Sequence, residues 1–271
     1  MATEHIRLLQ LSDIPFAQRV RKIAGWNQTD ADWDRLIRFE PEGCFLIECE
    51  GTPAGTATTT VHHDEVGWIG MVLVHPDFRR RGLATNLLNE CINYLKPRTK
   101  SIKLDATPAG MLVYEKLGFA EETRLHRWEG KGTASARPEG GGSELPLELD
   151  KLAFGADRSE FLMRLAQSSE VHTRSDRDGY GMIRKGINAS YLGSVVARVP
   201  KVGREIVETL LSQANDAAVY WDILDENLPA MKLAEKRGFE RQRELIRMRL
   251  GAKGFEGDLS RQWAITGPET G

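Results

Sequence analysis

This sequence is poor in the features that mark secreted, membrane-spanning or metal-dependent proteins. Its only cysteines are Cys44, Cys49 and Cys91, an odd number whose spacing matches neither a zinc site nor a disulfide framework. No run of about 18 apolar residues is present, and the opening MATEHIRLLQ has no apolar signal core. We therefore expect a cytoplasmic protein with no membrane span and no metal, in which Cys91 is a small core residue.

The charge balance excludes a further group of functions. The formal net charge is −2, so bulk attraction to nucleic acid or to a membrane is not expected, and any anion site must be local. Apolar residues make up 41% and charged residues 28% of the chain, which is typical of an ordinary globular protein. A length of 271 residues suits two domains of average size.

What the first half does contain is an alternation of strand and helix patterns. The nearly continuous apolar run at 66–74 predicts a central strand that is buried on both faces. The segment after it carries an apolar stripe at helical spacing. The other predicted elements are strands at 5–9 and 101–106, a helix at 13–26, two strands within 43–63 that turn at 51–53, and a helix that ends at Gly118.

The stretch at 133–146 is rich in Gly, Pro and Ser, and it is the best linker candidate in the chain. The alternative is a long loop inside a domain that keeps a strand beyond it. We predict one domain at 1–132 and a second at 147–271.

The second half repeats the first. Shifted by 120 residues, 104–127 lies on 224–247 with nine identities in 24 positions, among them Asp105/Asp225, Gly118/Gly238 and Arg127/Arg247. Shifted by 119 residues, the apolar stripe at 87–92 lies on a similar stripe at 206–211. Two consecutive elements match in the same order, so we infer an internal duplication of one α/β domain.

The segment RRRGLA at 79–84 stands where the buried strand gives way to a helix. A helix N-terminus exposes unpaired N–H groups and carries partial positive charge, which suits a phosphate. Gly82 has no Cβ to block a close approach, and Ala84 keeps the first turn open. Taken alone, the same segment can be a polar turn with exposed arginines.

With its context, the segment resembles the pyrophosphate loop of the GNAT acyl-CoA N-acyltransferase superfamily. LVHPDFRRRGLATNLL at 73–88 and LDATPAGMLVYEKLGF at 104–119 are similar to that superfamily's two most diagnostic segments. The resemblance covers roughly residues 4 to 130, and the duplication is similar to a subgroup with a second, divergent domain. It implies an α/β fold of two tandem domains, each with a mixed β-sheet that is splayed at its centre and flanked by helices.

The resemblance also implies a cofactor site. Acetyl-CoA would enter the splay as co-substrate. Its pyrophosphate would meet the loop and helix start, and its acetyl and pantetheine portion would meet the strand backbone as an added strand. The cofactor-binding residues are then Val72, Leu73, Val74, Arg79, Arg80, Arg81, Gly82, Leu83, Ala84 and Thr85, with Thr107 as a weaker candidate.

The chemistry needs an acid, a base and an oxyanion donor. By resemblance, the backbone N–H near Leu73 is the oxyanion donor, and Tyr114 faces the CoA sulfur as general acid; its alternative role is a half-buried helix aromatic. A phenol's pKa of about 10 lets it donate to a forming thiolate. The general base is not visible. The group His62, His63, Asp64 and Glu65 could reach the cleft through water, His75 is assigned a structural role, and Asp105 a role such as capping the next helix.

The second copy departs from the first at the functional positions. Gly82 aligns with Lys201 or Val202, Arg81 with Pro200, which has no N–H to offer, and Tyr114 with Ala234. The second domain therefore keeps the architecture and has lost the cofactor chemistry. We expect it to form one wall of the acceptor site, and we expect the tail at 261–271 to pack on the first domain.

These patterns favour an acetyl-CoA-dependent N-acetyltransferase that acts on a small amine, a protein N-terminus or a lysine. The alternatives are O-acyl transfer, a longer acyl-CoA, and a non-catalytic CoA-binding sensor. A dinucleotide-binding domain is disfavoured because no G-x-G-x-x-G opens a helix after the first strand. The sequence leaves the acceptor and the oligomeric state open, and a monomer is compatible because the duplication can replace a dimer.

Overall fold

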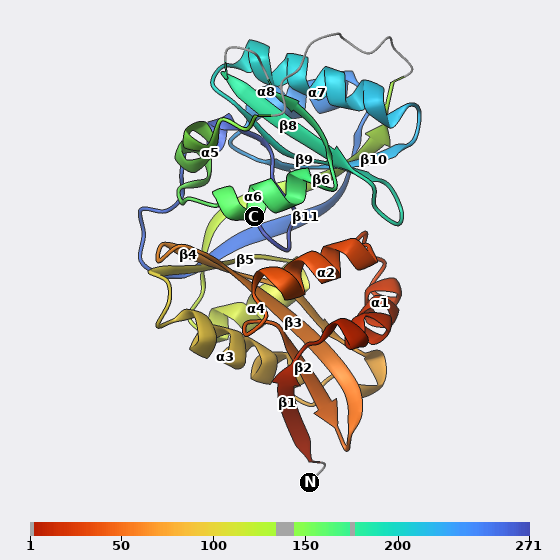
Figure 1. Ribbon diagram of the computed structural model, residues 1–271, viewed down its shortest axis with the longest axis vertical. Helices are drawn as coiled ribbons and strands as arrows, with labels where there is room; N and C mark the ends of the chain where they lie inside the picture. The colour runs from red at the N-terminus through yellow and green to blue at the C-terminus, as the bar shows by residue number, and fades with distance from the viewer. Residues whose placement is uncertain (1–2, 134–143, 174–176) are drawn as a thin grey trace.

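The computed structural model describes residues 3–133, 144–173 and 177–271, so most of the predicted linker lies outside the described residues. The described strands form one twelve-stranded sheet that runs along the whole molecule (Figure 1). The strand order is β1-β2-β3-β4-β5-β11-β6-β10-β9-β8-β7, with β12 paired to β9. The mixed sheet flanked by helices confirms the predicted fold class.

The first half follows the predicted order of elements. Its strands are β1 (Glu4–Leu8), β2 (Phe45–Cys49), β3 (Thr52–His62), β4 (Val66–Val74), β5 (Ser101–Ala106) and β6 (Ala120–Lys131). Its helices are α1 (Ile14–Ile23), α2 (Asp30–Phe39), α3 (Leu83–Leu95) and α4 (Pro108–Lys116). Helix α2 was not predicted. The sequence does carry a signal for its start, since the Thr29 and Asp32 side chains form a capping box.

The second half repeats this order from its first helix onward and adds one short strand at its end. Its strands are β7 (Glu170–Thr173), β8 (Gly179–Arg184), β9 (Ser190–Ala197), β10 (Ala218–Leu224), β11 (Glu240–Gly251) and β12 (Gln262–Ala264). Its helices are α5 (Leu147–Phe154), α6 (Ser159–Ala166), α7 (Pro200–Ala214) and α8 (Leu228–Lys236). Helices α7 and α8 correspond to α3 and α4, and β11 corresponds to β6, as the internal repeat predicts.

The two halves exchange a strand. Strand β6 follows α4 in the chain but pairs with β10 of the second half, and β11 pairs with β5 of the first half. The two exchanged strands also pair with each other along most of their length. The halves are therefore joined through continuous backbone hydrogen bonds at the centre of the sheet, and the chain end at 271 lies between them (Figure 1).

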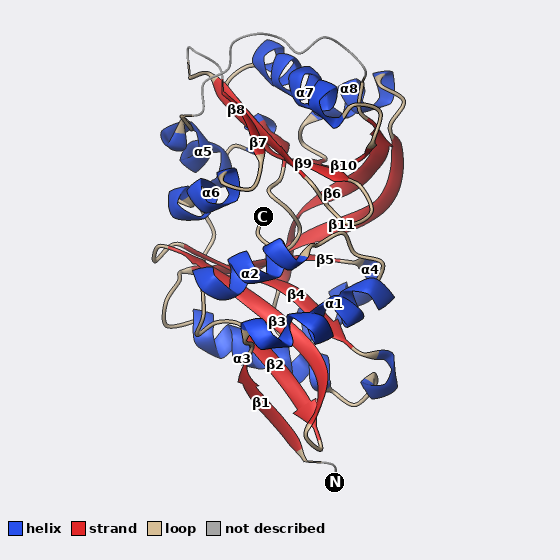
Figure 2. Cartoon of the chain, turned by 45° about the vertical axis from the view of Figure 1, so that its right-hand side comes forward, coloured by secondary structure: helices blue, strands red, loops and turns tan. Residues whose placement is uncertain are grey.

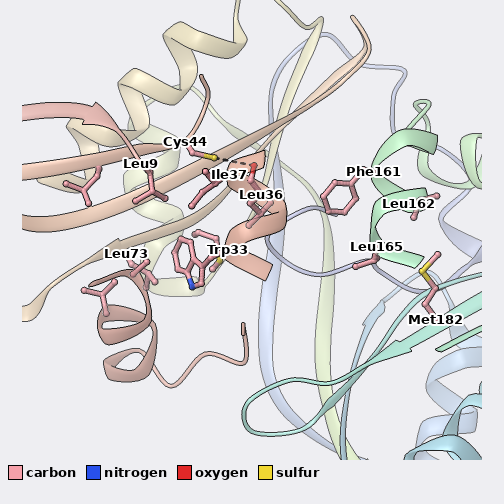
Figure 3. Packing of buried hydrophobic residues seen from close by; sticks show 14 of the residues in the cluster. Leu9, Trp33, Leu36, Ile37, Cys44, Leu73, Phe161, Leu162, Leu165 and Met182 are labelled. Atoms are coloured by element: carbon pink, nitrogen blue, oxygen red, sulfur yellow. Dashed lines mark hydrogen bonds between the residues drawn. The ribbon is translucent and has the colours of Figure 1, made fainter. Parts of the chain in front are cut away.

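Helices cover both faces of the first half of the sheet. Helices α1 and α2 pack on one face and α3 on the other (Figure 2). The α3 face buries Cys91, as predicted, and all three cysteines are buried thiols. The cluster on the α1 and α2 face extends into the second half, where Phe161, Leu165 and Met182 continue it from Trp33 and Leu36 (Figure 3). The apolar core on this side is thus common to both halves.

Candidate functional site

A cavity of about 230 Å³ lies where β4 and β5 separate. Its walls come from the α1–α2 connection, β4, α3, β5, α4, β11 and the tail after β12. The residues that line it include Trp26, Gln28, Val72, Tyr114, Arg243 and Glu269. The cavity is therefore built by both halves of the chain.

The separation of β4 from β5 is visible in their register. The two strands pair in parallel only at Val66–Trp68 against Ser101–Lys103. Beyond Trp68, β4 carries a β-bulge in which Met71 has φ +52°, and the Met71 carbonyl accepts a hydrogen bond of 3.0 Å from Thr56 Oγ1. A bulge bends its strand and increases the local twist, which turns β4 away from β5 and opens the sheet.

Beyond the bulge, the backbone of Leu73 faces β3 and not the gap. A Cβ at Gly55 on β3 would lie 2.8 Å from the Leu73 carbonyl oxygen, and His75 N–H donates to the Ala54 carbonyl at 2.8 Å. In an extended strand the N–H and C=O groups of alternate residues point to the same side. The N–H groups that point toward the gap are therefore those of Val72 and Val74.

The side chain of Leu73 supports the same orientation. It is buried in the cluster that contains Trp33, on the face covered by α1 and α2 (Figure 3). Val72 lines the cavity and Leu73 does not. Val72 packs instead with the cluster on the α3 face.

The loop before α3 presents unpaired N–H groups. Gly82 is the N-cap of α3 with φ +87°, Arg80 has φ +62°, and no atom lies within 4 Å of a Cβ at Gly82. The backbone N–H groups at 80–85 have no acceptor among the described residues. Arg79 Nε donates to the Val74 carbonyl at 3.1 Å, and Arg81 lies over the Phe78 ring. Leu83 is buried and anchors the helix, while Arg79, Arg80 and Arg81 are exposed.

Tyr114 lines the cavity from α4 and is half-buried. Burial raises the pKa of its phenol to about 12, so the hydroxyl keeps its proton at neutral pH. The hydroxyl has no hydrogen-bond partner among the described residues. Gly110, one turn earlier, leaves room for the ring, since a Cβ there would lie 3.0 Å from Tyr114 Cε2.

The end of β5 shows which residue caps α4. Thr107 lines the cavity and its side chain accepts a hydrogen bond of 3.2 Å from Gly110 N–H, so Thr107 is the N-cap. The prediction that Asp105 has this role is wrong. Asp105 is buried and binds Arg247 of β11 through both carboxylate oxygens.

The predicted route from 62–65 to the cleft is also wrong, because these residues lie at the turn between β3 and β4 and none of them lines the cavity. His62 is buried among Phe39, Phe154 and Phe161, and burial lowers the pKa of its imidazole to about 3. His63 lies near the Asp157 carboxylate, and Asp64 pairs with Lys100. Glu65 accepts a hydrogen bond from the Asp157 backbone N–H. His75 accepts a hydrogen bond from Asp77 N–H, which agrees with its structural assignment.

Several cavity residues were missed by the sequence reasoning. Trp26 and Gln28 come from the α1–α2 connection, Arg243 from β11, and Glu269 from the tail. No local motif marks them, because they meet only through the strand exchange and the path of the tail. The expectation that the tail packs on the first half is confirmed: Trp68 Nε1 donates to the Pro268 carbonyl at 3.0 Å.

Glu269 is the buried carboxylate of this tail. Gln28 Nε2 donates to its Oε2 at 2.8 Å, and Arg184 Nη2 lies 3.3 Å from its Oε1. Burial raises the pKa of the Glu269 carboxyl, and Arg184 opposes that shift. The Glu269 backbone packs on Gly70, where a Cβ would lie 2.5 Å from the Glu269 carbonyl oxygen. Glu269 is thereby held beside the residue that precedes the bulge.

The corresponding gap in the second half is filled by the chain itself. Strand β9 pairs in parallel with β10 only from Ser190 to Leu192, and beyond that β12 pairs with β9 at Val195 and Val196. Trp263 of β12 packs against Gly203, the residue that aligns with Ala84 on the shift of 119. The Trp221 indole donates to the Trp263 carbonyl at 2.7 Å. A ligand entering as an added strand would have to displace β12.

Two features are absent from the residues that the structure describes. In that part of the chain, no group of three or more His, Cys, Asp or Glu side chains is arranged to hold a metal ion. In the same part, every helix is too short or too polar to cross a bilayer.

Two family models match the chain in tandem. One described as "Acetyltransferase (GNAT) family" matches residues 9–119, and one described as "Acetyltransferase (GNAT) domain" matches residues 147–264. A protein named as an uncharacterized N-acetyltransferase of Bacillus subtilis is 28% identical over 196 residues, which cover 65% of this chain and 67% of that relative. Another of the same description from Methanocaldococcus jannaschii is 31% identical over 103 residues, 34% of this chain and 46% of the relative. The match thus spans less than half of the archaeal relative's length.

Solved structures share the whole architecture. A putative acetyltransferase from Pyrococcus horikoshii superimposes with a TM-score of 0.88 at 23% identity, over 99% of this chain and 96% of that one. A tandem GNAT protein from the clavulanic acid biosynthesis pathway gives a TM-score of 0.64 at 13% identity, over 92% and 98% of the two chains. At these identities the likeness shows the fold.

Proposed function

Since the chain belongs to the GNAT acetyltransferase superfamily and carries two GNAT domains in tandem, we propose that it transfers the acetyl group of acetyl-CoA to a primary amine by direct attack. The observation that carries the proposal is the cavity between β4 and β5. Ala84, in the first turn of α3 with its unpaired N–H group, and the protonated Tyr114 both line it. The first half provides this chemistry and the second half provides walls.

The cofactor would bind along the open edge of β4. The N–H groups at 80–85 suit the pyrophosphate, because they converge at a helix N-terminus and have no acceptor of their own. The acetyl and pantetheine portion would bind the N–H groups of Val72 and Val74, in the manner of an added strand. Thr107 borders the same cavity and is a further contact.

The oxyanion donor is assigned from the register of β4. Because the Leu73 backbone faces β3, we assign the N–H of Val72, and not that of Leu73, to the oxyanion that forms on the acetyl carbonyl. A donor fixed in a strand needs no reorganisation during the reaction, which is the basis of oxyanion stabilisation.

The two proton transfers are assigned to different walls. The amine nitrogen forms a bond to the carbonyl carbon, and the bond from that carbon to sulfur breaks. Tyr114 donates its proton to the departing thiolate. Of the two carboxylates that line the cavity in the described structure, Asp105 is held by Arg247. Glu269 is the group that accepts the amine's proton, directly or through a water molecule.

The test is to separate binding from turnover. Calorimetry with acetyl-CoA should give one site per chain, and a thiol assay should then detect free CoA when a suitable amine is added. A sensor would bind acetyl-CoA but release no CoA with any amine offered. Two binding sites per chain would contradict the assignment of the second half as a wall.

A further inference from the structure

Two buried polar atoms of opposite kind are left without partners in the same cavity. Gln28 Oε1 and Arg243 Nε are both inaccessible to solvent and make no hydrogen bond to any described residue. The Gln28 amide is oriented by its other end, because Nε2 donates to the Glu269 carboxylate, which can only accept. Its Oε1 therefore remains a free acceptor, while Arg243 remains a free donor. Buried polar groups normally make a hydrogen bond, so we expect a ligand to provide a partner for each of these two atoms.

Arg243 stands out among the guanidinium groups around the cavity. Arg247 binds Asp105, Arg127 binds Asp222, and Arg184 lies between Glu269 and Asp32. Arg243 makes no ion pair and no hydrogen bond with the described residues. Burial lowers the pKa of its guanidinium, the nearby charge of Arg127 adds to this effect, and Asp222 opposes it. Arg243 is half-buried and its Nε is fully buried, so its charge is partly desolvated without a paired counter-charge, and an anion that entered the cavity would offset that cost.

The wall formed by Gln28 and Glu269 offers hydrogen-bond acceptors, whereas Arg243 offers donors. The Glu269 carboxylate and the Gln28 Oε1 are both hydrogen-bond acceptors, and they belong to two residues joined by a hydrogen bond, one on the tail and one on the α1–α2 connection. The backbone contact between Glu269 and Gly70 places this acceptor wall beside the bulge of β4. An ammonium or amine nitrogen is the donor that suits this wall, and it would lie close to the proposed acetyl position.

The second half fixes this wall in place. Asn27, next to Gln28, donates to the Ala189 carbonyl at 2.9 Å and accepts from the N–H groups of Asn188 and Ala189. A Cβ at Gly186 would clash with the Asn27 side chain, so the fit is close. The spacing between the two walls is therefore set by the tertiary contact of the two halves and not by a mobile loop.

We propose that the acceptor is a small molecule that carries both an amine and a carboxylate, an amino acid or a close analogue of one. Its carboxylate binds the Arg243 guanidinium, and its amine lies against Gln28 Oε1 and Glu269. A guanidinium binds a carboxylate through two parallel hydrogen bonds, which gives orientation as well as affinity. This inference rests on the proposed acetyl transfer and names its substrate class. A cavity of about 230 Å³ that also receives the acetyl group admits a small acceptor.

The experiment compares each amino acid with the amine that lacks only its carboxylate. Phenylalanine with 2-phenylethylamine, methionine with 3-(methylthio)propylamine, and alanine with ethylamine serve as pairs, and release of free CoA is measured. For the unmodified protein we expect kcat/KM to favour at least one amino acid by about 100-fold or more over its paired amine, as for a site with buried groups built to bind the missing function.

Variants of Arg243 test whether this residue causes the preference for an amino acid over its paired amine. Arg243→Met should reduce the preference to within about threefold through a loss of kcat/KM with the amino acid, and Arg243→Lys should restore part of it. Arg241→Met is the matched control. Arg241 lies on the same strand with its guanidinium over the Trp128 ring, outside the cavity, so its removal should leave the preference intact.

Acetyl-CoA calorimetry on every variant separates the two claims. If acetyl-CoA binds and paired amines react as well as amino acids, the carboxylate inference is overturned and the acetyl transfer stands. If acetyl-CoA binds but no amine releases CoA, the proposed transfer fails. Calorimetry of the same amino acids with the CoA-bound protein then decides the inference: binding that Arg243→Met abolishes supports it, and an absence of binding overturns it.

Discussion

Asp105 and Arg247 form a buried, two-point ion pair across the boundary between the two halves of this protein. Arg247 Nε lies 2.9 Å from Asp105 Oδ1, and Nη2 lies 3.0 Å from Oδ2. Asp105 is on β5 of the first half and Arg247 is on the strand that the second half inserts beside it. The same relationship occurs once more in reverse, between Arg127 of β6 and Asp222 of β10. The ion pairs therefore accompany the strand exchange at both of its ends.

Removing one partner of the central pair should destabilise the fold. Asp105→Asn leaves the Arg247 guanidinium buried without a counter-charge, and we expect the free energy of unfolding to fall by about 3–5 kcal/mol. Urea unfolding measures this change. Glu121→Gln is the control, because the exposed pair of Glu121 with Arg124 is screened by solvent and should contribute little to stability. An equal fall in the free energy of unfolding in both variants would contradict the prediction that the buried ion pair contributes more than the exposed one.

The strand exchange predicts that neither half folds alone. In a fragment of residues 1–132, β5 would lack its partner β11 and β6 would lack its partner β10. In a fragment of residues 147–271, β11 would lack β5 and β10 would lack β6. Each fragment should show little cooperative thermal unfolding, and an equimolar mixture should regain it. A cooperative transition in either isolated fragment would mean that its own strand can replace the exchanged one.

The hydroxyl of Tyr114 should matter for turnover and not for binding. In Tyr114→Phe we expect kcat to fall by about 100-fold, which is typical for loss of a general acid, with acetyl-CoA affinity within about threefold of the original. Tyr94→Phe is a matched control, since Tyr94 donates to Glu40 away from the cavity. An unchanged kcat in Tyr114→Phe would remove Tyr114 from the mechanism.

Gly82 offers a test of the anion loop with a close control. Gly82 and Gly51 both have positive φ, +87° and +75°, and a Cβ at either meets no atom within 4 Å. Substitution by alanine should therefore cost each variant a similar stability, about 1 kcal/mol. Only Gly82→Ala places a Cβ where the pyrophosphate is proposed to approach, so only this variant should weaken acetyl-CoA binding, by about tenfold or more. Equal affinities in the two variants would place the cofactor elsewhere.

His62 should make stability depend on pH. The imidazole has a pKa of about 3 in the folded chain and about 6.5 when unfolded, so between these values the unfolded state binds a proton that the folded state does not. The free energy of unfolding should therefore fall as pH decreases below about 6.5, by about 2 kcal/mol between pH 7 and pH 5. Urea unfolding at the two pH values should show this loss in the original chain and a smaller one in His62→Phe.

Much of the fold could be read from local patterns. The apolar run at 66–74 is the central strand β4, and the apolar stripe after Gly82 is α3. The repeat between 104–127 and 224–247 corresponds to α4 and β6 against α8 and β11. The repeat also shows that Arg127 and Arg247 occupy equivalent positions, but it does not show which carboxylates they bind. The repeat aligns Asp105 with Asp225, whereas Asp222 has the equivalent role and Asp225 binds His126.

The sequence by itself determined the order of the elements, the duplication, and the glycine turn that opens α3, because periodicity and helix-end chemistry depend on neighbours within a few turns of the chain. Only the tertiary structure decided which strands exchange, that β12 fills the second gap, and that Gln28, Arg243 and Glu269 share one cavity. Residues 28 and 269 are 241 positions apart, and their contact depends on packing between whole elements. The part of the site that is proposed to bind the acceptor therefore arises from the fold and carries no local signature.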